Sequence, residues 1–146
     1  MSPWLVVPRV AGAAAGESTK ASGNPVPSSP EYESHPLRRV YRVTAYCDRG
    51  LTAAGVPAGV GQCAAPADIP FGSIIYIPDL DRRFVVTDRT ARRFRHNTVD
   101  LFMPRRDDCL DFGRQYLECH VYTPRERLKY GSPRLHASIA LVRKAD

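Results

Sequence analysis

Two aspartates follow or interrupt apolar segments in a way that suits proton transfer. Asp88 comes directly after Phe84-Val85-Val86-Thr87, and Asp100 lies in the middle of Thr98-Val99-Asp100-Leu101-Phe102. If both segments are strands, alternation points Asp100 away from its two apolar neighbours, and neighbouring strands would place both carboxyls on one side. Apolar surroundings and a second carboxylate both raise the pKa of an aspartic acid. The pair therefore suits general acid/base chemistry, with Asp100 protonated before the reaction.

A structural role is the alternative for both aspartates. An aspartate at the end of a strand often caps a turn, because its oxygens accept hydrogen bonds from backbone N–H groups. Residue type and position alone do not separate the two interpretations for Asp88 and Asp100.

Arginine dominates the charge of the chain, which has 21 Lys+Arg against 15 Asp+Glu and a net charge of +6. Guanidinium groups bind carboxylates and phosphates, so an anionic polymer is an expected partner. A solvated basic face is the alternative, and nucleic acid is a competing partner. Few aromatic residues accompany these arginines, so base stacking is weakly supported and no nucleic acid is expected. Eight of the arginines fall close together, at Arg82, Arg83, Arg89, Arg92, Arg93, Arg95, Arg105 and Arg106.

Four cysteines, at positions 47, 63, 109 and 119, permit two disulfides and are compatible with an oxidising compartment. A bridge between Cys47 and Cys119, with Cys63 and Cys109 as the other pair, is one of three pairings, and the sequence does not choose among them. No two cysteines have the close spacing common in zinc sites, and the histidines are not clustered. We therefore expect neither a metal nor another cofactor.

The apolar segments predict a mainly β fold with one short helix. Strands are expected at residues 40–46, 74–77, 84–87, 98–102 and 117–122, and the stretch 135–142 is compatible with a last strand. Pro104 suits the first position of a helix, and Cys109, Phe112, Gly113 and Tyr116 recur at helical spacing over about three turns. Many short strands in a core of about 100 residues favour a small barrel of six or so strands.

The 146 residues divide into three parts by composition. Residues 1–36 begin with a short apolar stretch and continue as a Pro- and Ser-rich linker, so we expect disorder there. The apolar stretch is similar to part of an export signal, although no basic residue precedes it and Arg9 interrupts it; a frayed terminus is the alternative. Residues 37–123 form the predicted domain and residues 124–146 a C-terminal extension. No apolar run is long enough to span a bilayer.

Several short motifs occur in an order that resembles a known family. They are Thr44-Ala45-Tyr46, Thr52-Ala53-Ala54-Gly55, Ile69-Pro70-Phe71-Gly72, Val86-Thr87-Asp88, Val99-Asp100-Leu101-Phe102-Met103-Pro104 and Phe112-Gly113-Arg114. Together they are similar to the 3D (three-aspartate) domain over roughly residues 39–122. This resemblance implies a double-psi β-barrel, the catalytic fold of one group of peptidoglycan lytic transglycosylases and of resuscitation-factor-like, stationary-phase cell-wall proteins.

The resemblance also implies roles for individual residues. Asp100 corresponds to the family's candidate acid/base and Asp88 to its second aspartate. The first aspartate is missing from its usual position, occupied here by Cys63-Ala64-Ala65-Pro66, and Asp68 lies two residues later. We expect the substrate to be bound by Asp68, Thr44, Tyr46, Thr52 and Arg89.

The implied function is cleavage of the MurNAc–GlcNAc β-1,4 bond of peptidoglycan by an exported monomer in the periplasm, cell envelope or extracellular space. Three alternatives remain open. The missing first aspartate favours a weak or inactive glycan-binding module of the same fold. A hydrolase in which two aspartates activate a water is the second alternative, and a nucleic-acid binder, supported by charge alone, is the third.

Overall fold

Segments rich in β-branched and aromatic residues form six strands in the computed structural model, which describes residues 31–94 and 96–145. The strands are β1 (Leu37–Tyr46), β2 (Gln62–Ala65), β3 (Ile74–Ile77), β4 (Arg82–Arg89), β5 (Thr98–Phe102) and β6 (Gln115–Tyr122). A short 3-10 helix, η2 (Arg92–Phe94), precedes β5, and two α-helices follow it, α1 (Arg106–Phe112) and α2 (Pro133–Ala145).

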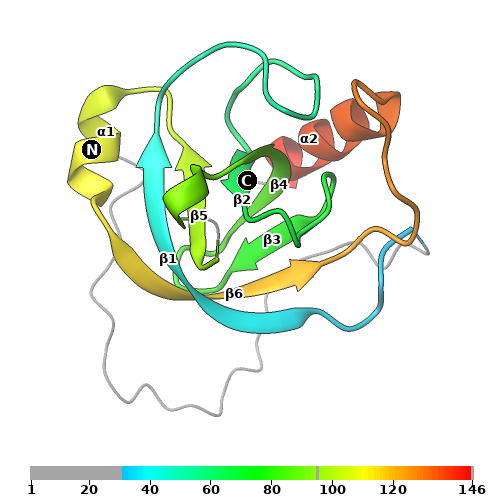
Figure 1. The fold of residues 1–146 in the computed structure, drawn as a ribbon, viewed down its shortest axis with the longest axis horizontal. Helices are drawn as coiled ribbons and strands as arrows, with labels where there is room; N and C mark the ends of the chain where they lie inside the picture. The colour runs from blue at the N-terminus through cyan, green and yellow to red at the C-terminus, as the bar shows by residue number, and fades with distance from the viewer. Residues whose placement is uncertain (1–30, 95, 146) are drawn as a thin grey trace.

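The six strands close into a barrel in the order β1-β5-β2-β4-β3-β6, and β6 pairs with β1 to complete the circle (Figure 1). The pairs β1/β5 and β2/β4 are parallel, and the other four pairs are antiparallel. Closure leaves no strand edge of the barrel without a partner strand. This mainly β barrel confirms the predicted fold class.

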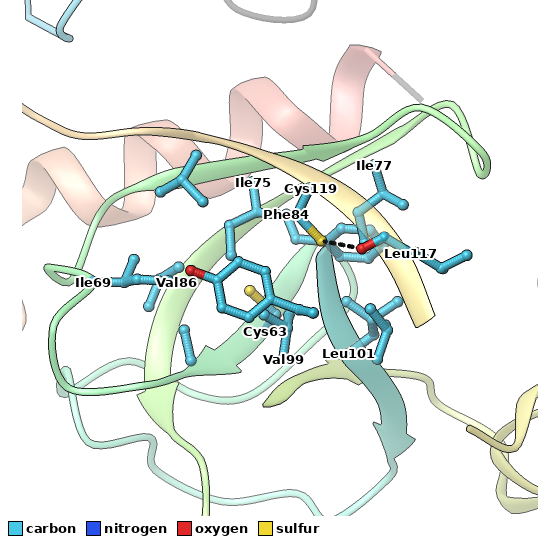
Figure 2. Close-up of a cluster of buried hydrophobic side chains, with 14 of the residues drawn as sticks. Cys63, Ile69, Ile75, Ile77, Phe84, Val86, Val99, Leu101, Leu117 and Cys119 are labelled. Carbon is cyan, nitrogen blue, oxygen red and sulfur yellow. Dashed lines mark hydrogen bonds between the residues drawn. The ribbon is translucent and has the colours of Figure 1, made fainter. Parts of the chain in front are cut away.

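The barrel is filled by alternate side chains from every strand, as Figure 2 shows for the interior cluster. Tyr41 and Val43 of β1 point inward and are fully buried, while Arg42 between them is only half-buried. Each such inward-facing residue transfers apolar surface out of water, which is the main driving force for closing the barrel. The other strands supply Cys63, Ala65, Ile75, Ile77, Phe84, Val86, Val99, Leu101, Leu117, Cys119 and Val121.

The C-terminal segment is a helix, so the last strand considered for residues 135–142 is wrong. Leu135, Ile139 and Val142 recur at spacings of four and three, which is a helical period, and all three are buried. They form a second cluster with Ile74 and Val85 on the outside of the barrel. The Ser132 hydroxyl accepts a hydrogen bond from the Arg134 N–H at 3.1 Å and so caps the start of α2.

The first helix is shorter than the three turns expected from the sequence. Helix α1 has seven residues and ends at Gly113, whose φ of +66° lies in the left-handed region that favours glycine. Tyr116, which the helical spacing had included, already belongs to β6 and is exposed. Among the described residues, no helix is long and apolar enough to cross a membrane.

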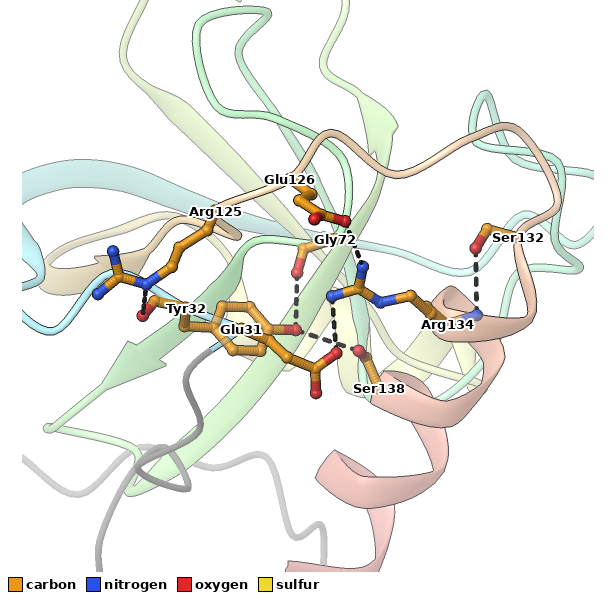
Figure 3. A network of polar contacts seen from close by, with 8 residues as sticks. All are labelled: Glu31, Tyr32, Gly72, Arg125, Glu126, Ser132, Arg134 and Ser138. Carbon is orange, nitrogen blue, oxygen red and sulfur yellow. Dashed lines mark hydrogen bonds and ion pairs between the residues drawn. The ribbon is translucent and has the colours of Figure 1, made fainter.

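Part of the expected linker packs against the barrel. The Tyr32 ring is buried, its hydroxyl donates to the Gly72 carbonyl at 3.2 Å, and it shares a hydrogen bond of 3.1 Å with Ser138 of α2 (Figure 3). Arg134 forms an ion pair with Glu31 at 2.6 Å beside it. The packed structure therefore begins before residue 37. The rest of the predicted disordered segment, residues 1–30, lies outside the described residues.

Candidate functional site

Four residues on neighbouring strands form one row across the barrel wall. Thr44 of β1 is in register with Asp100 of β5, and Asp100 is in register with Ala64 of β2. Ala64 is in turn in register with Asp88 of β4. The two aspartates therefore flank a single alanine, with their Cα atoms two strand spacings apart, about 10 Å. The structure brings three of the predicted site residues, Thr44, Asp88 and Asp100, into this row.

A β-bulge on β4 determines where Asp88 points. Cys63 pairs with Val86, but the next pair along the strands is Ala64 with Asp88, so Thr87 is an extra residue on β4. Val86 faces the barrel interior, and strict alternation would turn Asp88 inward as well. The bulge shifts the alternation by one residue and places Asp88 on the same outer face of the sheet as Ala64.

Asp100 is a half-buried carboxyl with a raised pKa. Burial is the largest cause, because it disfavours the charged form, and the negative charges of Asp48 and Asp88 act in the same direction. A hydrogen bond of 2.9 Å from the Thr44 hydroxyl and the positive charge of Arg42 oppose the rise. The net effect is a raised pKa, which is the direction that a general acid needs.

The Asp88 carboxylate has a structural role in addition to its charge. Its Oδ1 accepts hydrogen bonds from the backbone N–H of Ala53, at 3.1 Å, and of Arg89, at 2.9 Å. These bonds attach the loop after β1 to the end of β4, so the turn-capping interpretation describes part of what Asp88 does. They use one carboxylate oxygen, and the negative charge of the group still acts on Asp100.

Tyr46 lies near both aspartates. Its ring packs edge-to-face on Phe102, with centroids 5.6 Å apart, and its hydroxyl is buried without a hydrogen-bond partner among the described residues. Burial raises the pKa of Tyr46 well above its ordinary value, and negative charge at Cys63, Asp88 and Asp100 adds to the rise. Tyr46 is therefore a neutral O–H donor at physiological pH, in the electrostatic range of both carboxylates.

Two further predicted binding residues, Thr52 and Arg89, make structural contacts. The Thr52 hydroxyl is buried and donates to the Val56 carbonyl at 2.8 Å within its own loop. The Arg89 guanidinium donates to the Ile69 carbonyl at 2.8 Å and lies 3.9 Å from the centroid of the Phe71 ring. A part in substrate binding for Thr52 and Arg89 stays a prediction.

Asp68 is not part of the row that contains Asp88 and Asp100, and a part in substrate binding for Asp68 stays a prediction. Its exposed carboxylate lies 3.9 Å from the Arg39 guanidinium, near the start of β1. Arg39 and Thr44 are five residues apart on that strand, a span of about 16 Å. The sequence could not show this, because the segment between β2 and β3 is a loop whose course depends on tertiary contacts.

Sequence reasoning missed two charged residues that act on Asp100. Arg42 precedes Thr44 by two residues, so both side chains share the outer face of β1. Its guanidinium lies 4.1 Å from the centroid of the Phe94 ring, and its Nε donates to the Thr98 hydroxyl at 3.1 Å. Asp48 follows the end of β1 and raises the pKa of Asp100. Strand alternation from Thr44 was the signal that could have identified Arg42.

The arginine-rich segment is spread over the barrel rather than gathered at the aspartates. Arg82 and Arg83 begin β4 and pair with Ile77 and Tyr76 of β3, at the opposite end of the strand from Asp88. Arg93 lies 5.0 Å from the centroid of the Phe94 ring, on the side of the molecule where Arg42 also meets this ring. Arg95 is outside the described residues.

The four cysteines are free thiols in this structure. Cys47 is among the groups that raise the pKa of Cys109, whereas Cys119 is buried in the barrel interior, so the fold brings Cys47 closer to Cys109 than to Cys119, the partner considered from strand order. Within the described part of the chain, no group of three or more His, Cys, Asp or Glu side chains could hold a metal ion.

No protein-family model matches the sequence, and a search of curated proteins finds no significant match. The resemblance to the 3D domain therefore depends on the order of the short motifs.

Proposed function

We propose that this protein is a glycan-cleaving enzyme of the lytic transglycosylase type, with Asp100 as its general acid and base. The observation that carries the proposal is the raised pKa of Asp100 in a row with Asp88. The order of motifs that resembles the 3D domain supports the same conclusion and supplies the proposed substrate, the MurNAc–GlcNAc β-1,4 bond of peptidoglycan.

The reaction requires one group that first donates and then accepts a proton. In the proposed mechanism, the protonated Asp100 carboxyl donates its proton to the glycosidic oxygen as the bond to the anomeric carbon breaks. The 6-hydroxyl of the same muramic acid then attacks that carbon and forms a 1,6-anhydro ring. The ionised Asp100 accepts the proton of this hydroxyl, so the acid is regenerated and no water is consumed.

The neighbours of Asp100 supply two further effects in this proposal. The negative charge of Asp88 stabilises the positive charge that develops on the sugar ring as the bond breaks. Arg42 and Arg93, both beside Phe94, attract the carboxylates of an anionic wall glycan. An exported location follows from this substrate.

A glycan-binding module of the same fold is the second candidate. It is favoured by Asp68, whose carboxylate pairs with Arg39 and leaves the proposed active site with two of the family's three aspartates. A hydrolase in which the two carboxylates activate a water is the third candidate.

Digestion of purified peptidoglycan distinguishes the three candidates. Soluble muropeptides lighter by one water than the hydrolysis products support transglycosylation, and products with new reducing ends indicate hydrolysis. Retention of the protein on the polymer without soluble product indicates a binding module. Asp100→Asn is expected to lower the cleavage rate by about 100-fold or more. Cleavage at the wild-type rate by this variant would exclude Asp100 as the acid.

A further inference from the structure

Cys47 and Cys109 lie side by side although 61 residues separate them in the sequence. The Met103 N–H donates to the Tyr46 carbonyl at 2.8 Å, and the Cys109 thiol lies 3.8 Å from the Met103 carbonyl oxygen. Cys47 directly follows Tyr46, and it is one of the groups that raise the pKa of Cys109. Figure 1 shows the same neighbourhood in the fold, with α1 beside the end of β1. These contacts place the two cysteines in one neighbourhood, which is the first requirement for joining them.

Access to solvent distinguishes this pair from the other two cysteines. Cys47 and Cys109 are partly exposed, whereas Cys63 and Cys119 are fully buried in the barrel interior, as Figure 2 shows. A dissolved oxidant can therefore reach one of the two pairs and not the other.

We propose that Cys47 and Cys109 form a disulfide that fastens α1 to the end of β1 when the protein is in an oxidising environment. The oxidant is a low-molecular-weight disulfide. The thiolate of one cysteine attacks a sulfur of the oxidant, forms a mixed disulfide and releases one small thiol. The second cysteine then attacks the protein sulfur of that mixed disulfide and releases the other small thiol. The protein loses two electrons and two protons, and the oxidant is reduced to two thiols.

The bridge would act beside the candidate site. The chain runs from Asp100 through Met103 into α1, so fixing Cys109 to Cys47 limits the movement of α1 relative to the strand that carries Thr44 and Tyr46. Burial raises the pKa of Cys109 to about 11, with Cys47 and Asp100 as further causes. Formation of the bridge does not depend on the proposed glycan chemistry and can be measured without any substrate.

The test uses the full chain, treated in the native state at pH 8 with oxidised glutathione and, in parallel, with a reducing agent. After removal of any glutathione adduct, the oxidised protein is expected to be about 2 Da lighter, because two hydrogen atoms are lost. A digest without reduction should contain one linked peptide pair joining Cys47 to Cys109. The oxidised protein should also melt about 10 °C higher than the reduced one, since closing a loop of this length restricts the unfolded chain.

Single substitutions provide the controls. Cys47→Ser and Cys109→Ser should abolish both the mass loss and the melting shift, whereas Cys119→Ser should keep both. Four thiols that all remain free after oxidation would overturn the proposal. A linked pair that includes Cys63 or Cys119 would overturn it as well.

Discussion

Asp88 and Asp100 are in register with the same residue, Ala64, from the two sides of strand β2. Ala64 is itself buried, so other side chains cover it, and the two acids influence each other through their charge. The raised pKa of Asp100, to which Asp88 contributes, is the electrostatic consequence of this arrangement. Substituting the residues that act on Asp100 should therefore raise or lower its pKa, depending on the effect that each residue has on it.

Thr44→Val should extend cleavage to higher pH. The Thr44 hydroxyl donates to the Asp100 carboxylate at 2.9 Å and lowers the pKa of that group. Valine has the same shape without the hydroxyl, so the pKa of Asp100 should rise further and the protonated acid should persist to higher pH. The measurement is the pH profile of muropeptide release. An unchanged high-pH limb would show that Asp100 does not control it.

Substitutions of Asp88 separate its charge from its hydrogen bonds. Asp88→Asn removes the negative charge but keeps an oxygen that can accept from Ala53 and Arg89, so the high-pH limb should move to lower pH, opposite to the Thr44 variant. Asp88→Ala removes the acceptor too and should lower the free energy of unfolding by about 1 kcal/mol. Urea titration of both variants checks this. Equal stability of the two would mean that the cap contributes nothing measurable.

Asp100→Asn should change the pH dependence of stability as well as activity. Since the pKa of Asp100 is raised in the folded state, the stability linked to its proton is fully present below the ordinary pKa of 3.8 and is lost as the pH rises through the folded-state pKa. The variant lacks this loss. The free energy of unfolding of the variant minus that of the wild type should therefore be more positive at pH 7 than at pH 3. Unfolding curves at the two pH values measure the difference. A difference of the opposite sign would contradict burial as the main cause of the shift.

Five of the six strands and the outward direction of Asp100 could be predicted from the sequence, because they follow from local alternation, whereas β2 was not among the expected strands. Val99 and Leu101 face the interior, so Asp100 between them faces outward. The position of Asp88 could not be predicted in this way. It depends on the bulge at Thr87, and the register between β2 and β4 comes from strands that are distant in the sequence. The proximity of Cys47 to Cys109 likewise could not be predicted, because it depends on the packing of segments that are distant in the sequence.

The C-terminal helix was open to prediction, since Ser132 and Pro133 precede a segment with apolar residues at helical spacing. The stretch 135–142 is short and apolar, and such runs are compatible with both a strand and a helix when alternation alone is considered. The contact that decides between them is made with the outer side of the barrel, at Ile74 and Val85. This surface exists only after the strands have closed.

Leu135→Ala should show that α2 belongs to the same folding unit as the barrel. Leu135 is fully buried against the outside of the barrel, and truncating a buried leucine leaves a cavity as well as removing apolar contact. The expected loss is about 3 kcal/mol in the free energy of unfolding. Leu141 on the same helix is 45% exposed, so Leu141→Ala provides the matched control and should cost less than about 1 kcal/mol. Urea unfolding followed by a signal from the barrel, such as hydrogen-exchange protection of the strand amides, should give a single transition that shifts for the Leu135 variant. A barrel transition at the wild-type midpoint in that variant would show that α2 unfolds independently.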